Sequence, residues 1–183
     1  MGFFYSALFS HVFHIQITPV FVLLNIVLSY LPDTDVPVEL LQRGRLGGRE
    51  HGSHRGLTHY PILYLVATTI LYFVLGSSWA VIFFVNTFTH LLLDSFGSGW
   101  GLKWFWPVST DQYKLFTNKE DNSFAWTELI THWTTQEFSE KALKYGDDNW
   151  FRNLYFKPTP TLAFELATFF SGLFSLVWYV FTT

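Results

Sequence analysis

The sequence predicts an all-α fold: an integral membrane helical bundle of four to five membrane segments. Half of the 183 residues are hydrophobic, aromatic residues reach 21% and charged residues only 14%, which is unusual for a soluble domain of this length. The 21 Phe, 8 Trp and 9 Tyr suit a bilayer, because amphipathic rings favour the headgroup layer. The apolar stretches are residues 3–13, 18–31, 61–76, 79–93 and 162–181.

The apolar stretches differ in length. Only residues 162–181 are long enough to cross a bilayer unaided. The others need flanking aromatics, local thinning or mutual packing, because about 15 helical residues reach only about 22 Å. The Gly-Ser-Ser sequence at 76–78 predicts a tight turn, so that 61–76 and 79–93 form antiparallel helices. Residues 3–13 either cross or lie outside, so the sequence allows both four and five passes.

A polar segment precedes the last apolar stretch. We interpret residues 1–183 as a single membrane domain and residues 97–161 as an interfacial or cytoplasmic insertion between the last two membrane helices. This insertion is rich in Trp and Phe, and Ser123 can cap a helix that continues to about Tyr145. Such a helix would lie along the membrane surface. The alternative is a small soluble cap whose aromatic residues form a core of their own.

The distribution of charge indicates the orientation and excludes some partners. All 11 Lys and Arg lie within residues 32–60 and 97–161, which favours a cytoplasmic position for these segments in an inner membrane. The net charge of −3 and the absence of a basic tract argue against nucleic acid. Because the chain has no Cys, any metal must be held by nitrogen and oxygen ligands.

Three polar clusters stand where apolar stretches meet polar loops: LPDTD at 31–35, HRGLTH at 54–59 and HLLLD at 90–94. Carboxylates and imidazoles gathered at one membrane interface repel one another or stay undersatisfied unless a cation binds among them. A divalent metal, above all zinc, suits such ligands. The candidate metal ligands from these clusters are Asp33, Asp35, His54, His59, His90 and Asp94.

The spacing of these residues suggests their chemistry. His90 and Asp94 are one helical turn apart, so both can reach a single ion. Arg55 suits the binding of a phosphate or a developing oxyanion, although it could also pair with a lipid phosphate. Asp33 and Asp35 could bridge two ions, divide the roles of ligand and general base, or form an ordinary Asx turn. We take Asp33 and Arg55 as the candidate catalytic residues.

Ser10-His11, LPDTD, HRGLTH and HLLLDSFGSGWGLKWFWPVS occur in this order between residues 10 and 110. Together they resemble the membrane-bound, metal-dependent hydrolases, a family that includes a LexA-binding inner-membrane-associated protein. The resemblance implies a multi-spanning helical protein and adds His11 to the candidate metal ligands. Val36 and Tyr60 depart from the family's pattern but leave the ligands intact. The ligand order is also similar, more distantly, to that of zinc-dependent phospholipase C.

Together these patterns predict a membrane-embedded hydrolase. It would use one to three zinc ions, or another divalent metal, on a phospholipid-like phosphoester or ester at the membrane surface. The alternative is a non-catalytic membrane metalloprotein that acts as a sensor or recruits a partner. Peptide hydrolysis within the membrane is disfavoured, because the chain has no HExxH sequence. The expected partners are the lipid bilayer and a lipid or phosphoester substrate.

Overall fold

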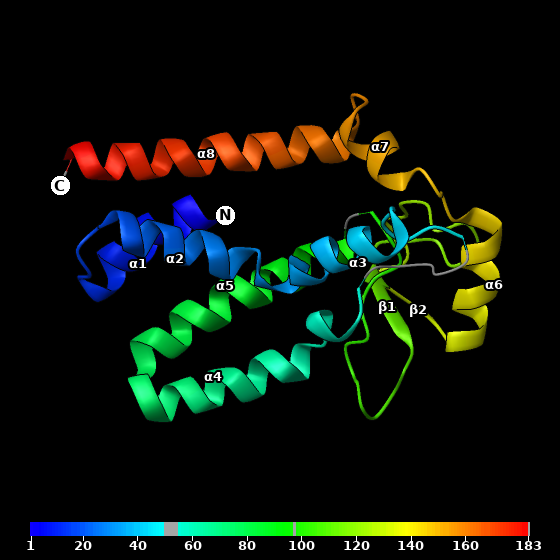
Figure 1. Ribbon diagram of the computed structural model, residues 1–183, viewed down its shortest axis with the longest axis horizontal. Coiled ribbons are helices and arrows are strands. Elements are labelled where there is room, and N and C mark those ends of the chain that lie inside the picture. Colours follow the sequence, from blue (N-terminus) through cyan, green and yellow to red (C-terminus); the bar gives the residue numbers. More distant parts are fainter. Residues whose placement is uncertain (50–54, 97, 183) are drawn as a thin grey trace. The chain divides into compact units, whose positions relative to one another are not determined.

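The computed structural model describes residues 1–49, 55–96 and 98–182, which are mostly helical (Figure 1). Two short strands, β1 (Gln112–Leu115) and β2 (Ile130–Trp133), lie between α5 and α6 in the sequence. The helices are α1 (Gly2–Phe13), α2 (Pro19–Ser29), η1 (Leu31–Thr34), α3 (Asp35–Arg43), η2 (Leu57–His59), α4 (Pro61–Leu75), α5 (Ser77–Phe96), α6 (Thr135–Tyr145), α7 (Trp150–Tyr155) and α8 (Pro160–Thr182), where η marks a 3-10 turn.

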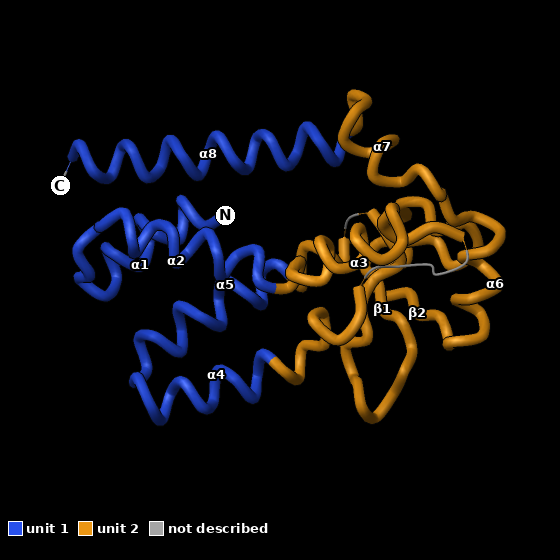
Figure 2. Tube along the Cα trace, in the orientation of Figure 1, with its two compact units in different colours: residues 1–31, 64–90, 160–183 blue, residues 32–63, 91–159 orange. Residues whose placement is uncertain are grey.

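The chain divides into two compact units (Figure 2). Unit 1 consists of residues 1–31, 64–90 and 160–182, and unit 2 of residues 32–63 and 91–159. Unit 1 therefore holds most of the apolar helices, whereas unit 2 holds the strands and most of the polar loops. The boundary crosses α5, which continues unbroken from one unit into the other.

In unit 1, α1 packs against both α2 and α8. The approach to α2 is close at Gly2, where an added Cβ would lie 2.6 Å from Ile26 Cα. A side chain at this position would therefore push the two helices apart. The buried core of the unit consists of three rings and one aliphatic side chain: Tyr5, Phe9, Phe21 and Ile82.

Two helices among the described residues, α5 with 20 residues and α8 with 23, are long and apolar enough to cross a membrane. A third span results if α2 and residues 31–43, bent by 73° at their junction, count as one. The 15 residues of α4 and 12 of α1 fall below the about 20 that a bilayer requires. By length and composition, the described part of the chain contains two to three candidate membrane spans.

The predicted turn after residues 61–76 is confirmed. Helix α4 ends at Leu75, Gly76 alone connects, and α5 begins at Ser77. Gly76 has φ 89°, a backbone conformation that glycine adopts far more readily than other residues. The two helices contact each other through the rings of Tyr64 and Phe83, whose centroids are 6.2 Å apart.

The helix predicted from Ser123 to Tyr145 is wrong in its first half. Residues 130–133 form β2, which pairs antiparallel with β1. Burial alternates along β2, since Thr131 and Trp133 are buried whereas Ile130 is exposed. This period of two is that of a strand, but apolar residues three apart also fit a helical face. The fold is therefore mostly helical with a small sheet, which corrects the all-α prediction.

The helical half of the predicted segment begins later, at Thr135. A capping box sets this start: Thr134 Oγ1 accepts from the Glu137 N–H, and Glu137 Oε2 accepts from the Thr134 N–H. Helix α6 packs Phe138 edge-on against Trp100, which also meets the fully buried Trp133. Trp100, Trp133 and Phe138 thus form part of a core within unit 2, whereas Phe124 and Trp126 are exposed.

Candidate metal centre

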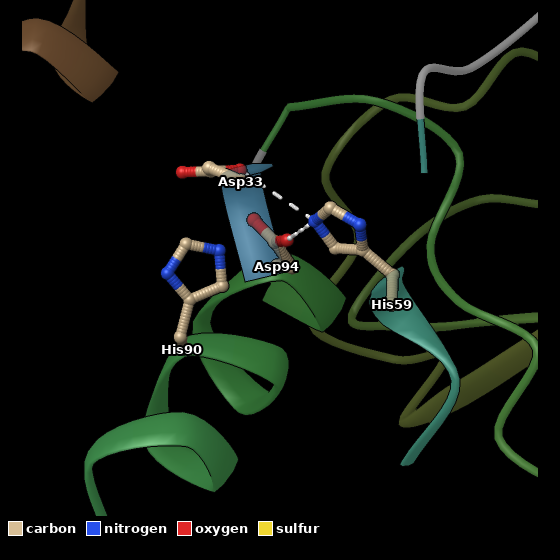
Figure 3. A group of neighbouring side chains, drawn as sticks. All are labelled: Asp33, His59, His90 and Asp94. Carbon is tan, nitrogen blue, oxygen red and sulfur yellow. Dashed lines mark ion pairs between the residues drawn. The ribbon is translucent and has the colours of Figure 1, made fainter. Parts of the chain in front are cut away.

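Four metal-ligating side chains come together at the ends of η1, η2 and α5 (Figure 3). Asp33 lies in η1, His59 ends η2, and His90 and Asp94 lie one turn apart on α5. One ligand atom from each residue lies within 4.8 Å of the others. The group, called the metal cluster below, could therefore hold a single ion.

The distances in the metal cluster match those between ligands of one ion. His59 Nε2 lies 3.5 Å from Asp33 Oδ1 and 3.3 Å from Asp94 Oδ2. Hydrogen bonds from nitrogen to oxygen are commonly about 2.7–3.2 Å long. Adjacent ligands of a tetrahedral zinc ion, with bonds of about 2.0–2.1 Å, lie about 3.3 Å apart. The His59 contacts are thus longer than most hydrogen bonds and match the spacing of neighbouring ligands of one ion.

The charge around His59 also suits a cation. The residue is 1% exposed, and Asp33, Asp35 and Asp94 all lie within 3.5 Å of its ring nitrogens. Burial lowers the pKa of His59, but hydrogen bonds to the three carboxylates outweigh burial and raise the pKa to about 10. A metal ion would supply positive charge where the metal-free protein holds a proton.

Asp35 lies behind His59 rather than in the metal cluster. It occupies the first position of α3, and its Oδ2 is 3.4 Å from His59 Nδ1. Thr58 Oγ1 lies 3.1 Å from the same nitrogen. A carboxylate at this nitrogen fixes the tautomer and the ring orientation, so that Nε2 faces Asp33 and Asp94. The structure therefore places Asp35 where it orients a ligand.

His90 is oriented from α2. Its Nδ1 donates a hydrogen bond of 2.8 Å to the backbone carbonyl of Ser29, which directs Nε2 toward a metal. The hydroxyl of Ser29 donates to Asn86 Oδ1 at 2.7 Å, and Asn86 Nδ2 donates to Asn25 Oδ1 at 2.9 Å. All three polar side chains are buried. This chain of hydrogen bonds, the Asn86 network, ties α2 to α5 just before the metal cluster.

Arg55 holds Asp94 in place. Its two terminal nitrogens donate to Asp94 Oδ1 at 2.8 Å and to the Asp94 carbonyl at 2.9 Å. The arginine side chain is 6% exposed, so this charge-assisted pair is shielded from solvent. The pair engages Oδ1 of Asp94, while Oδ2 faces His59.

Two further predicted ligands remain, His54 and His11. His54 lies outside the described residues. His11 lies near the end of α1, where its ring meets Tyr179 of α8 edge-on at 6.2 Å, and its role as a ligand stays a prediction. Sequence analysis missed the part that Ser29 and Asn86 have in orienting His90. The available signal was the spacing of Asn86, which lies one helical turn before His90.

Comparison with known families supports the membrane setting. The family model of the YdjM inner membrane protein matches residues 1–181. The chain belongs to the YdjM inner membrane protein family. This YdjM-family membership agrees with the membrane-associated family that the sequence motifs resemble, and with the candidate spans α5 and α8. A search of curated proteins and one of solved structures found no match.

Replacing His90 or Asp94 with Ala should remove metal from the purified YdjM-family protein, because each supplies one ligand of the cluster. Elemental analysis of protein purified with zinc measures the effect. His14→Ala is the matched control, since His14 is exposed at the end of α1. Undiminished metal in either variant would contradict the ligand assignment.

Replacing Asn86 with Ala should weaken zinc binding by about 10- to 100-fold, as loss of a group that orients a ligand commonly does. Competition with a chromophoric chelator gives the affinity. Thr69→Ala is the control, because Thr69 is an exposed polar residue of α4 that bonds only within its own helix. Equal affinities in the wild type and Asn86→Ala would show that the Ser29 carbonyl orients His90 without the network.

Zinc binding should strengthen with rising pH. The metal must displace the proton of His59, whose pKa is raised to about 10 in the metal-free protein. The affinity should therefore rise about tenfold per pH unit between about pH 6 and pH 8, with about one proton released per ion near neutral pH. Calorimetry in buffers of different ionisation enthalpy counts these protons. Binding at neutral pH without proton release would exclude His59 as a ligand.

Proposed function

We propose that this protein is a membrane-embedded, metal-dependent hydrolase that acts on a phospholipid-like phosphoester or ester at the membrane surface. The observation that carries the proposal is the metal cluster at the end of the apolar helix α5, next to the buried Arg55. Ionisable groups at such positions are costly and usually serve a function. Family membership supports the membrane setting.

The donor set favours zinc as the metal. Two imidazoles and two carboxylates suit zinc, with another divalent metal as the alternative. The metal cluster has donors for one ion, and the sequence predicts one to three ions at the site, with His11 and His54 as further candidate ligands. When bound, the ion would acidify a water molecule and offset the charge that develops on the ester oxygen.

The residues in and around the metal cluster have different roles in the proposed reaction. The Asp33 side chain is 33% exposed, against 18% for Asp94 and 1% for His59. Asp33 is therefore the carboxylate of the metal cluster most open to water and substrate, and we assign it the role of general base in place of that of a fourth ligand. Arg55 offers a planar guanidinium to a phosphate oxygen or a developing oxyanion. Asp35 and Ser29 keep the two imidazoles turned toward the ion.

The proposed membrane arrangement has four to five segments. Helices α5 and α8 cross fully, and the shorter α2 and α4, with or without α1, complete the bundle. No Lys or Arg occurs in these five helices, which supports a cytoplasmic position for the loops that carry the basic residues. The metal cluster then faces the headgroups of the inner leaflet, where lipid esters are concentrated.

A non-catalytic metal site is the second candidate function. Four protein ligands can complete a tetrahedral zinc ion and close the site to substrate. Such a protein would sense metal or recruit a partner. The exposure of Asp33 favours the hydrolase, because a closed structural site does not need a carboxylate that is open to solvent.

Replacing Arg55 with Lys should leave zinc bound but lower kcat/KM about tenfold or more, because Lys keeps the charge without the planar fork. The assay screens lipid phosphoesters and acyl esters with zinc-loaded protein in mixed micelles. Asp94→Ala serves as the metal-deficient reference. Arg152→Lys serves as the matched control, since Arg152 is exposed on α7.

Two results would count against these assignments. If the zinc-loaded wild type hydrolyses none of these esters, the hydrolase proposal is wrong. The non-catalytic metal site, which senses metal or recruits a partner, then becomes the proposed function. If Arg55→Lys turns over substrate as fast as the wild type, Arg55 has no role in binding phosphate or an oxyanion.

A further inference from the structure

Unit 2 contains a cavity of about 100 Å³ beside the metal cluster. Arg55, Gly99, Trp100 and Asn122 are among the residues that line it. Because Arg55 also binds Asp94, one side chain connects this cavity with the metal cluster. A single water molecule needs about 10–15 Å³ of such volume. The cavity therefore has room for a group of several heavy atoms.

Gly99 brings the backbone directly against Arg55. It has φ +89°, and an added Cβ would lie 2.9 Å from a terminal nitrogen of Arg55. A side chain at this position would displace the guanidinium that the cavity and Asp94 share. The glycine thus keeps Arg55 at the cavity wall.

Lys114 of β1 lies next to this wall, because its ammonium group bonds to two of the residues that line the cavity. The residue is 4% exposed, and its Nζ donates to the Gly99 carbonyl and to Asn122 Oδ1, both at 2.8 Å. Both acceptors are neutral and belong to residues that line the cavity. A buried ammonium is costly without an opposite charge. Burial, and then the charge of Arg55, lowers the pKa of Lys114 to about 7.

The neighbouring carboxylates have other hydrogen-bond or ion-pair partners. Asp94 binds Arg55, and Asp148 pairs with Arg45 at 3.2 Å. Asp147, which lines the cavity, accepts hydrogen bonds from the Asn149 N–H and from Asn153 Nδ2. A divalent ion in the metal cluster would add further positive charge. Both hydrogen-bond acceptors of Lys114 are neutral, so an anion in the cavity would offset the charge of this ammonium group.

We infer that this cavity is the subsite for a phosphate group of the substrate, held by Arg55 and Lys114. Guanidinium and ammonium groups are the usual side-chain donors to phosphate oxygens. The inference rests on the proposed function, which places ester hydrolysis at the adjoining metal cluster. It narrows the substrate class from esters in general to phosphate-bearing compounds, either a lipid headgroup or a soluble phosphoester.

Lys114→Met tests the subsite, because it removes the charge and keeps most of the volume of the side chain. If Lys114 were only structural, this change would leave the protein as stable as before or more stable, as is common when a buried charge becomes apolar. Lys157→Met is the matched control, since Lys157 is an exposed lysine of the same unit. Circular dichroism checks folding, and Lys114→Gln takes the place of Lys114→Met if the latter does not fold.

Calorimetric titration of zinc-loaded, detergent-solubilised protein measures binding. The probes are glycerol phosphate, short-chain phosphatidylglycerol and the phosphate-free short-chain diacylglycerol. Lys114→Met should weaken binding of the phosphate-bearing probes about tenfold or more, the loss expected for one charge-assisted hydrogen bond. Its zinc content should stay that of the wild type. Equal affinities in Lys114→Met and the wild type would overturn the subsite, as would diacylglycerol binding as tight as that of phosphatidylglycerol.

The probes also identify the source of the phosphate. Tighter binding of phosphatidylglycerol assigns it to a lipid, and equal or tighter binding of glycerol phosphate assigns it to a soluble ester; both support the subsite. Phosphate binding that depends on Lys114, without ester hydrolysis, would refute the hydrolase and leave the subsite standing. Ester hydrolysis with the same KM in Lys114→Met and the wild type would refute the subsite alone.

Discussion

Three carboxylates surround the buried imidazole of His59. Their mutual repulsion must be offset for η1, α3, η2 and α5 to meet at this point. Arg55 offsets one of the three negative charges through its pair with Asp94. A proton on His59 offsets a second negative charge and leaves the third. A divalent ion in place of this proton would offset both of the negative charges that Arg55 leaves. The metal-loaded form is therefore the one in which these groups reach neutrality.

The residues of the metal cluster could be predicted from sequence, but their roles could not. His90 and Asp94 lie at the end of an apolar run, where burial of a charge is costly. Because of this cost, ionisable residues at such positions indicate a functional site in the sequence. Asp33 and Asp35 look equivalent in the sequence. In the structure Asp33 belongs to the metal cluster, whereas Asp35 orients His59. This difference arises because Asp33 lies in η1 and Asp35 is the first residue of α3. Ser29 contributes a backbone carbonyl, which every residue carries, so no side-chain pattern can reveal that contact.

The fold shows the same contrast between features set by local sequence, which can be predicted, and features set by contacts between distant residues, which cannot. Long apolar runs and the Gly76 turn predict the helices of unit 1, because hydrophobic length and glycine conformation are local properties. Strand β2 depends on a partner 15 or more residues away, and its apolar spacing also fits a helix. The burial of Lys114 is likewise set by contacts with Gly99 and Asn122 rather than by its own neighbours in sequence.

The Asn86 network has a consequence for how α5 can vary. Asn86, His90 and Asp94 follow one another at four-residue intervals on one helix, so their side chains share one face only while this spacing is kept. One residue inserted among them would turn one partner by about 100° relative to the next. Insertions or deletions before Asn86 do not change the orientation of these three side chains relative to one another. The first half of α5 can thus adapt to bilayer thickness, whereas its second half has a fixed length.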